Sequence, residues 1–415
     1  MPSEDTGPAS RAEPPREALR SLTRSDLIER GRRLGAATWN LGISRWFWPE
    51  GVALLGLADF ALAAGSDHGD SSEGTHGSDH GDSSEGTHGS DHGDSTGGND
   101  GLARVRAWAD AMLASDRPVG HVNDLAPAAA ALTAGIDVVR LARFIEWARC
   151  APRSASGAIE HWKDGLWADT MYMVGVLFAR LGAANGDTGL LDEAAEQYLL
   201  HAQVLQDDRS GLFAHGSHRG ETLWNFWGRA NAWAALTAVE ILEAGRSLGG
   251  LTGATRELTH LTEVHERLDT QLNSLAACQP PHGVWDVLVD GQPETTGIVE
   301  TSAAAGIAAA MIRFAGPHDS GSAQSPLGAA GHLALRGALA YMGDDGCLGG
   351  VSDGTILQLL PFGYAVIRSD RPQLWGQGLA LAAIAAALEA PAPPALEAPV
   401  PAPLETHDAA QGPQE

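Results

Sequence analysis

The sequence predicts an all-α fold in which an inner ring of helices is wrapped by an outer ring, an α/α toroid. Segments that are apolar on one face alternate with segments that are apolar nearly all round, as expected of outer and enclosed helices. Glycine-rich turns such as 182–189 and 343–350 separate these segments. About a dozen helices in this alternation fit a two-layer ring better than separate small domains.

The alternation can be followed along the chain. Residues 51–65 and 101–115 have helical patterns and predict a helix hairpin. Residues 190–205 are apolar on one face, whereas 171–184 are apolar nearly all round. The same pairing of an amphipathic or mixed segment with an apolar one recurs at 104–116 and 125–136, 256–276 and 299–315, and 327–343 and 375–390. Strand signals are few, and 284–291 predicts a short hairpin.

We predict one folded domain over residues 23–390. Residues 1–22 are rich in proline, serine and charge, and 391–415 in proline and alanine, so both ends are predicted to be disordered. Between 65 and 100 the repeat GSDHGDSSEGTH brings nine carboxylates and no lysine or arginine, which predicts a disordered insert. Its five histidines could hold a transition metal weakly, but an unstructured tract without a ligand is the simpler interpretation.

Charge and composition exclude several classes of partner. A net charge of −25 argues against nucleic acid and anionic membranes, which are held by lysine and arginine. The three cysteines lie far apart and build neither a disulfide framework nor a zinc site. No apolar run follows the start and no stretch of about 18 apolar residues occurs. We therefore expect a soluble cytoplasmic protein, either a monomer or a homodimer.

Twelve tryptophans stand beside only four tyrosines, and many lie at expected helix starts. In a toroid the starts of the inner helices share one end, so these rings could meet at a sugar-binding site, because indole faces stack on sugar rings. The alternative is that they fill a large core. The tryptophans at such positions are Trp46, Trp48, Trp162, Trp167, Trp224, Trp227, Trp233 and Trp375.

Asp169 is the strongest candidate for a catalytic acid. It stands in the first turn of an otherwise apolar helix, two residues after Trp167. Desolvation beside an indole raises the pKa of a carboxyl and would keep it protonated as a general acid. A helix N-terminus has the opposite effect, because it stabilises the carboxylate. A plain N-cap is therefore the structural alternative for Asp169.

A second candidate region covers residues 211–233. Trp227, Arg229 and Trp233 enter a long apolar helix, and an arginine flanked by indoles suits bidentate recognition of a carboxylate. The alternative for Arg229 is an ion pair with an acid at a helix start. His215 and His218 lie in the loop just before, where a single histidine is more often a surface or capping residue.

Five segments, spread over roughly residues 40–390 in the right order and spacing, resemble the unsaturated glucuronyl and rhamnogalacturonyl hydrolases of glycoside hydrolase families 88 and 105. The resemblance to family 105 is closer because of the third segment. The segments are WADTMYM (167–173), LLDEAAEQYLLHAQVLQDDRSGLFAHG (190–216), FWGRANAW (226–233), ETSAAAGIAAAM (300–311) and WGQGLALAAIAAALE (375–389).

The resemblance implies an (α/α)6 barrel that removes a 4,5-unsaturated uronic acid from the non-reducing end of lyase-generated oligosaccharides. Asp169 would protonate C4 of the vinyl ether, water would add at C5, and the hemiketal would collapse and release the aglycone sugar. The reaction needs no cofactor and no metal ion, and its partner is a small oligosaccharide. The residues expected at the sugar site are Trp48, Trp167, His215, Trp227, Arg229, Trp233 and Trp375.

The sequence departs from the family at its second aspartate. The family usually reads Asp-x-Ile-Asn-x-Gly, whereas GHVNDLAPAAAAL (120–132) places Gly120 at the aspartate position. Asp124, displaced along the chain, is the candidate second catalytic carboxylate.

Two other functions on the same toroid stay open at this point. A sugar epimerase or isomerase needs two facing histidines, for which the candidates are His161, His201, His215, His260 and His332. A non-catalytic carbohydrate-binding protein is the other alternative, in which the fold persists without the second carboxylate.

Overall fold

The computed structural model describes residues 21–65, 97–115, 117–252, 260–316 and 325–390. Within these ranges the longer helices alternate between an outer and an inner position along the chain. The outer helices are α1 (Arg24–Asn40), α3 (Gly97–Leu113), α5 (Ala142–Cys150), α7 (Thr188–Leu205), α9 (Leu261–Ala277) and α11 (Pro326–Leu339). The inner helices are α2 (Trp48–Gly65), α4 (Ala126–Thr133), α6 (Ala168–Asn185), α8 (Gly228–Thr252), α10 (Thr301–Ala315) and α13 (Leu374–Glu389).

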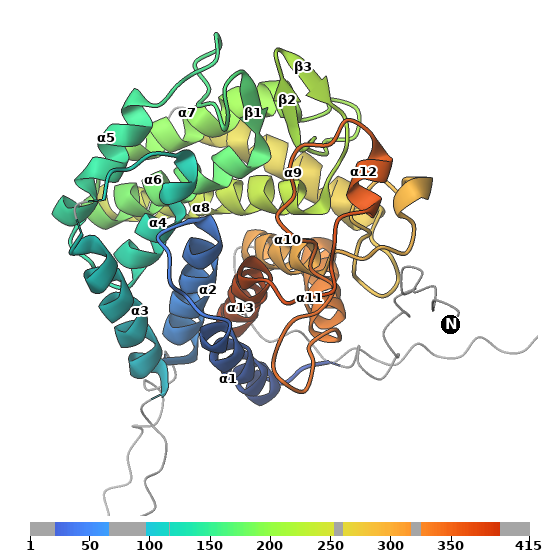
Figure 1. The fold of residues 1–415 in the computed structure, drawn as a ribbon, viewed down its shortest axis with the longest axis horizontal. Coiled ribbons are helices and arrows are strands. Elements are labelled where there is room, and N and C mark those ends of the chain that lie inside the picture. Colours follow the sequence, from blue (N-terminus) through green and yellow to red (C-terminus); the bar gives the residue numbers. More distant parts are fainter. Residues whose placement is uncertain (1–20, 66–96, 116, 253–259, 317–324, 391–415) are drawn as a thin grey trace, which may run out of the picture.

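The inner helices form a closed ring. Each packs against the next in sequence, and the last, α13, packs against α2, as Figure 1 shows. Most residues of α6, α10 and α13 are buried, because these helices are enclosed by the ring and by the outer helices. This is the (α/α)6 barrel, so the predicted all-α toroid is confirmed.

The ring closes through a close contact of glycines on α2 and α13. A Cβ atom added to Gly56 would lie 2.1 Å from the carbonyl oxygen of Gly378, and one added to Gly378 would lie 2.3 Å from the carbonyl oxygen of Val52. Any side chain at either position would overlap the partner backbone. The close approach of the two helices therefore depends on glycine at both positions.

Gly378→Ala is expected to lower the free energy of unfolding by about 1–3 kcal/mol, because the added methyl group meets a backbone carbonyl instead of a side chain that can turn away. Urea unfolding followed by circular dichroism measures this loss. Gly249→Ala is the matched control: Gly249 also lies in a helix, but a Cβ there would meet nothing within 4 Å. Alanine at position 249 is expected to be neutral or stabilising, and an equal loss in both variants would contradict the packing argument.

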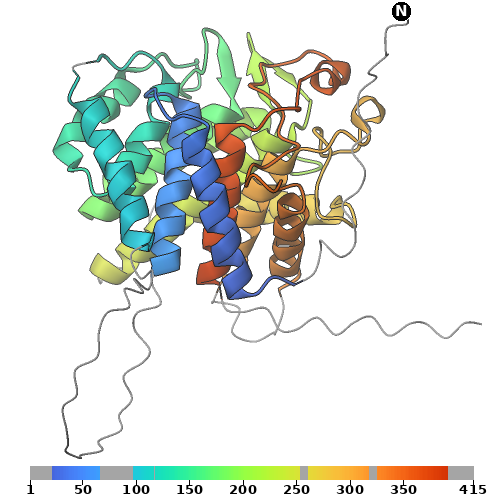
Figure 2. The same cartoon turned by 60° about the horizontal axis from the view of Figure 1, so that its bottom comes forward.

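Short elements gather at the end of the barrel where the inner helices begin, which we call the N-terminal end. Strands β1 (Gly165–Trp167), β2 (Gly216–His218) and β3 (Glu221–Leu223) form an antiparallel sheet in the order β1-β2-β3. Figure 2 shows this sheet and the single-turn helix α12 (Pro361–Ala365) at the same end of the barrel. In the described part of the chain, short 3₁₀ helices lie between the longer helices at η2 (Val122–Asp124), η3 (Val138–Leu141) and η4 (Pro293–Thr295).

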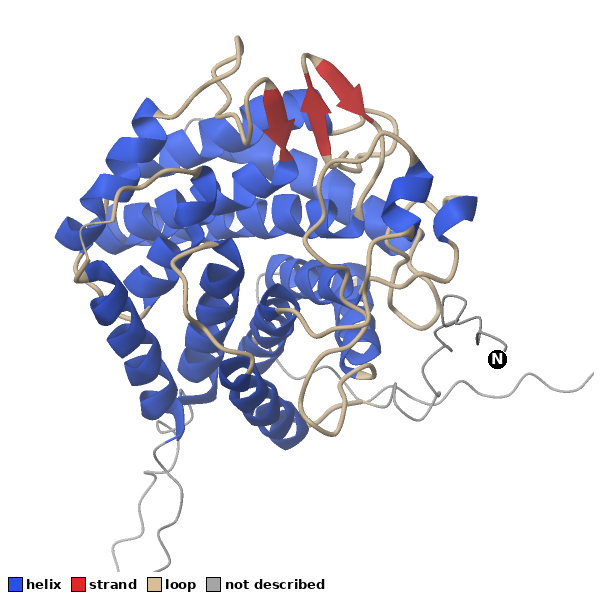
Figure 3. Cartoon of the chain, viewed as in Figure 1, coloured by secondary structure: helices blue, strands red, loops and turns tan. Residues whose placement is uncertain are grey.

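The predicted hairpin over 284–291 is wrong. This segment forms isolated bridges, from Leu288 to Trp227 and from Asp286 to Val299, and the strands lie elsewhere (Figure 3). Its apolar side chains are buried, so the apolar character of this segment reflects burial of an irregular stretch and not local strand pairing.

A network of ion pairs lies toward the opposite, C-terminal end of the inner helices. Arg180 on α6 contacts Asp59 of α2 at 2.8 Å and Glu240 of α8 at 2.7 Å, and Arg313 of α10 contacts Glu240 at 2.8 Å. Arg180 also donates to the hydroxyl of Thr133 on α4. Burial raises the pKa of Glu240, but the charges of the two arginines outweigh burial and bring it to about 2. The network thus connects five inner helices: α2, α4, α6, α8 and α10.

Some predicted segments cannot be compared with the structure. The predicted disordered ends, 1–22 and 391–415, lie almost wholly outside the described residues, and so does most of the insert at 65–100. Helix α2 ends at Gly65 and α3 already begins at Gly97. In the part of the chain that is described, no helix has the length and apolar character needed to cross a bilayer.

Candidate active site

Asp169 lies at the start of α6, directly after strand β1. Trp167 occupies the N-cap position in an extended conformation, and Asp169 follows in the first turn. The N-cap alternative for Asp169 is therefore wrong, because the tryptophan holds that position. The amide of Ala168 donates to the carbonyl oxygen of His215 at 3.0 Å, which fixes the helix start against β2. The side chain of Asp169 is 14 % exposed.

His215 connects Asp169 to helix α12. Trp167 pairs with Gly216 in the sheet, which places His215 beside α6, with its Nε2 atom 3.6 Å from Oδ2 of Asp169. The other ring nitrogen, Nδ1, lies 2.8 Å from the hydroxyl of Tyr364. Both His215 and Tyr364 are fully buried. The imidazole is therefore hydrogen-bonded to Tyr364 through Nδ1, while its Nε2 atom faces the candidate acid.

The pKa of Asp169 is lowered, so the expectation of a raised pKa is wrong for the free protein. Burial raises it, but the interaction with His215 and the charges of His215, His161 and Arg229 together outweigh burial. Burial lowers the pKa of His215, although Asp169 opposes this. The charged and polar groups of His215, His161 and Arg229 thus decide the pKa of Asp169. In the free protein Asp169 is therefore ionised at neutral pH.

The expected gathering of rings at the N-terminal end of the barrel is present. A continuous series of ring contacts links the starts of α6, α8, α13 and α2. His161 stacks on Trp167 with ring centroids 4.6 Å apart, and Trp167 meets His215 at 5.2 Å. His215 contacts Trp227 at 4.3 Å. The series continues through Arg229, which lies 4.2 Å from the Trp227 ring and 5.4 Å from the Trp375 ring, to Trp48, 4.7 Å from Trp375.

Trp233 lies one layer deeper than the other predicted site residues. Its ring is fully buried and contacts Tyr172 at 4.6 Å. Since α8 begins at Gly228, Trp233 is in the second turn, below Arg229. The structure thus links the other predicted sugar-site residues in one series of contacts at the N-terminal end of the barrel, and Trp233 lies beneath them.

Several buried polar atoms in this cluster have no hydrogen-bond partner within the described residues. Buried polar groups are normally paired, by protein groups, water or a ligand. A ligand rich in hydroxyl and carboxylate oxygens could pair with the N–H groups of Trp227, Arg229 and Trp375 among them. They are Oδ2 of Asp169, Nε2 of His215, Nε of Arg229, and Nε1 of Trp227, Trp233 and Trp375.

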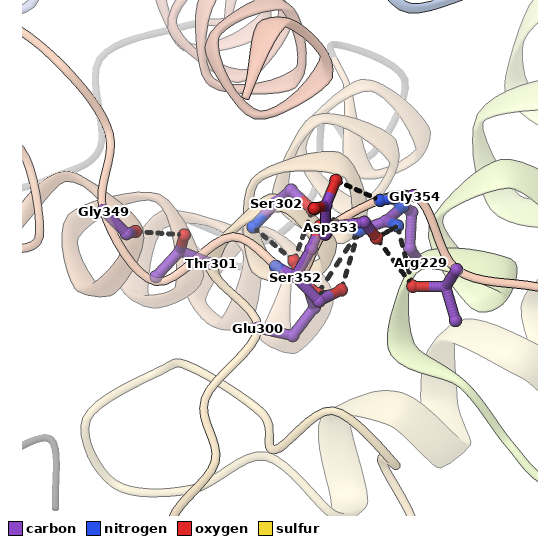
Figure 4. A network of polar contacts seen from close by, with 9 residues as sticks. Arg229, Glu300, Thr301, Ser302, Gly349, Ser352, Asp353 and Gly354 are labelled. Atoms are coloured by element: carbon purple, nitrogen blue, oxygen red, sulfur yellow. Dashed lines mark hydrogen bonds and ion pairs between the residues drawn. The ribbon is translucent and has the colours of Figure 1, made fainter. Parts of the chain in front are cut away.

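Arg229 is held by an acid at a helix start, the alternative considered from the sequence. Its Nη1 atom contacts Oε2 of Glu300, the N-cap residue of α10, at 3.3 Å. Nη1 also donates to the Ser352 hydroxyl at 3.0 Å, and Nη2 donates to the carbonyl oxygen of Asp353 at 3.0 Å (Figure 4). The terminal nitrogens are therefore engaged by protein, and Nε is the guanidinium nitrogen left without a partner.

Asp124 lies in the 3₁₀ turn η2, where its carboxylate serves the backbone. Oδ2 accepts hydrogen bonds from the amides of Gly120 at 2.9 Å and His121 at 3.1 Å, and Oδ1 lies 3.6 Å from Arg117. These contacts close a capping box. They account for the conformation of the loop, and a catalytic part for Asp124 stays a prediction.

Of the histidines considered for an epimerase, some make contacts away from Asp169 and others lie near it. His201 contacts the carbonyl oxygens of Gln197 and Ile159 inside the outer layer. His260 pairs with Asp192, and His332 is absent from the ring series. Of the histidines considered for an epimerase, only His161 and His215 approach Asp169, and both lie against Trp167. Among the described residues, no three His, Cys, Asp or Glu side chains are grouped to hold a metal ion.

Comparison with known proteins assigns the chain to a family. A family model described as Glycosyl Hydrolase Family 88 matches residues 94–390. The chain belongs to glycosyl hydrolase family 88. The unsaturated rhamnogalacturonyl hydrolase YesR of Bacillus subtilis is 29 % identical over 252 residues, which are 58 % of this chain and 67 % of that relative.

Solved structures share the fold of this family 88 chain at low sequence identity. A possible member of family 105 from Salmonella enterica is 21 % identical with a TM-score of 0.70, covering 88 % of this chain and 94 % of that one. The unsaturated glucuronyl hydrolase of Bacillus sp. GL1 is 15 % identical with a TM-score of 0.57, covering 87 % and 96 %. These similarities show a common barrel.

Three residues near the site of this family 88 hydrolase were not predicted from the sequence. His121 lies 5.2 Å from His161, Tyr364 contacts His215, and Glu300 pairs with Arg229. Glu300 begins the segment ETSAAAGIAAAM, where an acid before a helix is a recognisable N-cap. Tyr364 lies in the single-turn helix α12, which is too short for a periodic pattern to mark its inward direction.

Proposed function

We propose that this family 88 hydrolase removes a 4,5-unsaturated uronic acid from the non-reducing end of an oligosaccharide by hydrating its vinyl ether. The observation that carries the proposal is the buried carboxyl of Asp169, 3.6 Å from His215, at the same end of the barrel as Arg229 and the tryptophan rings. Its similarity to YesR, an unsaturated rhamnogalacturonyl hydrolase, supports this substrate class. A cytoplasmic location and a monomeric or homodimeric state are part of the proposal.

Asp169 supplies the proton in the proposed reaction. It transfers a proton to C4, and the positive charge that develops at C5 is shared with the ring oxygen. Water adds at C5 and returns its proton to the Asp169 carboxylate. The hemiketal then opens, and the hemiacetal exposed at C1 releases the aglycone sugar. This sequence uses one carboxyl group as acid and then base, so it does not require the spaced carboxylate pair of ordinary glycosidases.

Substrate binding prepares Asp169 for this role. In the free protein the carboxyl is ionised because its pKa is lowered. An anionic sugar placed against it adds a negative charge and displaces water, and both changes raise the pKa of a carboxyl. The enzyme is therefore expected to take up a proton as the substrate binds.

We expect kcat/KM to fall as the pH rises from weakly acidic to alkaline. The parameter kcat/KM reports the free enzyme. There the pKa values of Asp169 and His215 are both lowered, so the pair is deprotonated over most of this pH range. The fall in kcat is expected at a higher pH, because bound substrate raises the pKa of Asp169. Initial rates over a pH series at constant ionic strength measure both profiles. A kcat/KM that rises with pH through this range would contradict the proposed acid.

Ultraviolet absorbance tests the activity directly. Hydration consumes the C4–C5 double bond, so the absorbance of unsaturated disaccharides prepared with lyases from pectin, ulvan or glycosaminoglycans should disappear. The disaccharide that reacts fastest identifies the uronide and the leaving sugar. Binding by calorimetry without any loss of absorbance would favour a sugar-binding protein, and no response to any of the three substrates would count against the proposal.

A further inference from the structure

Glu300 is a fully buried carboxylate to which the proposed reaction assigns no chemical step. All of its interactions are with donors of the protein. Oε1 accepts from the amide of Ser302 at 3.2 Å and from the Ser302 hydroxyl. Oε2 accepts from Arg229, from the amide of Ser352 at 3.0 Å, and from the Ser352 hydroxyl. With these donors around both of its oxygens, the Glu300 carboxylate has no free position for a substrate.

These contacts join three segments at the N-terminal end of the barrel (Figure 4). Arg229 belongs to the start of α8, Ser302 to the start of α10, and Ser352 to the segment 349–355. Thr301 joins the same two segments. Its amide donates to the carbonyl oxygen of Gly350 at 3.0 Å, and its hydroxyl donates to the carbonyl oxygen of Gly349 at 2.6 Å. Glu300 is the residue that all three segments share.

The orientation of Arg229 depends on this arrangement. Nη1 lies 3.3 Å from the Ser302 hydroxyl as well as from Glu300, and Nη2 lies 3.3 Å from the hydroxyl of Thr355. The guanidinium also lies against the rings of Trp227 and Trp375. With both terminal nitrogens fixed, the Nε–H group is the donor that remains for a ligand.

We propose that Glu300 is a positioning residue that sets how Arg229 recognises the carboxylate of the substrate. The inference rests on the proposed function. Glu300 balances the buried charge of Arg229 and fixes the plane of its guanidinium, while making no contact with substrate itself. Without this carboxylate the guanidinium would be left as a buried, unpaired charge, and its terminal nitrogens would lose a partner that defines their direction.

The test compares Glu300→Gln with the wild-type enzyme on two substrates: an unsaturated disaccharide and the same disaccharide with its uronate methyl-esterified. For the free acid, kcat/KM is expected to fall about tenfold to hundredfold, the effect of losing a charged hydrogen bond, mostly through KM. The ester lacks the charge that Arg229 recognises, so its kcat/KM should change much less. The preference for acid over ester should therefore shrink.

Glu240→Gln is the matched control. Glu240 is also buried and paired with arginine, but toward the opposite end of the inner helices. This variant should lose stability and keep the wild-type preference for acid over ester. Ser302→Ala, which removes one hydroxyl between Glu300 and Arg229, should shift the preference in the same direction as Glu300→Gln by a smaller factor, and it provides the test if Glu300→Gln does not fold.

The outcomes separate the two proposals. If the wild-type enzyme does not consume the free acid at all, the proposed function fails. If the wild-type enzyme does consume the free acid, the positioning role of Glu300 is overturned when folded Glu300→Gln keeps the wild-type preference for acid over ester. If Glu300→Gln does not fold, an unchanged preference in Ser302→Ala overturns it. A preference that shrinks in Glu240→Gln to the same extent would also overturn it, because general destabilisation would then explain the effect.

Discussion

Asp169→Asn is expected to reduce kcat by about 10²–10⁴-fold, the usual contribution of a general acid and base. The amide has nearly the same size as the carboxyl, but it cannot donate the proton to C4 or recover it from the attacking water. Loss of absorbance from an unsaturated disaccharide at saturating concentration measures kcat. Because the substitution conserves volume in a largely buried position, substrate binding and the melting temperature should change much less than kcat.

Asp164→Asn is the matched control for this experiment. Asp164 lies five residues earlier, in the loop before α6, with its side chain exposed and its φ angle at 60°, a conformation that asparagine also adopts readily. Activity close to that of the wild type is expected. If Asp169→Asn kept more than about a tenth of the wild-type kcat in a folded protein, Asp169 would not be the acid.

Arg180→Met is expected to lower the free energy of unfolding by about 3–5 kcal/mol, because it leaves the paired carboxylates of Asp59 and Glu240 without their shared cation. The side chain of Arg180 is only 19 % exposed, and that of Glu240 only 8 %, so water replaces the lost charge poorly. Urea unfolding measures the change. Since Arg180 lies late in α6, toward the opposite end from Asp169, the KM of the remaining folded protein should stay near the wild-type value.

Arg368→Met provides the comparison with an exposed pair. Arg368 contacts Asp370 at 2.6 Å, but the two side chains are 48 % and 63 % exposed, so no measurable loss of stability is expected. A similar effect of both substitutions would contradict the role given to the buried network. Acidification offers a second check: the pKa of Glu240 is about 2, so the stabilisation by its ionised form is present at neutral pH and lost only as the pH falls toward that value.

The helical ring could be predicted from the sequence because burial on all sides leaves a clear pattern. Helix α13, for example, is apolar nearly all round and begins at Leu374, one residue before the predicted start. The sheet left no such pattern, since each of its strands spans three residues. Residues 284–291 are rich in apolar β-formers without forming a hairpin, because their bridge partners are Trp227 and Val299, outside the segment.

The candidate site was predictable where its residues are close in sequence or carried by a motif. Trp167 and Asp169 are neighbours at one helix start, and Arg229 lies in FWGRANAW. The pKa of Asp169 was not predictable, because it depends on His215 and Arg229, which only the fold brings near. Tyr364 likewise reaches the site from the short helix α12, far away in the sequence, and no pattern in a single sequence indicates that contact.

The contact between α2 and α13 has a consequence for how the protein is made. These helices are the first and last of the inner ring, so their glycines can meet only after synthesis has passed residue 378. A growing chain on the ribosome therefore carries the exposed apolar surfaces of α2 and α10 until the final helix emerges. Chaperone binding during translation should be prolonged for such a chain, since incomplete domains with uncovered apolar surface are prone to aggregate.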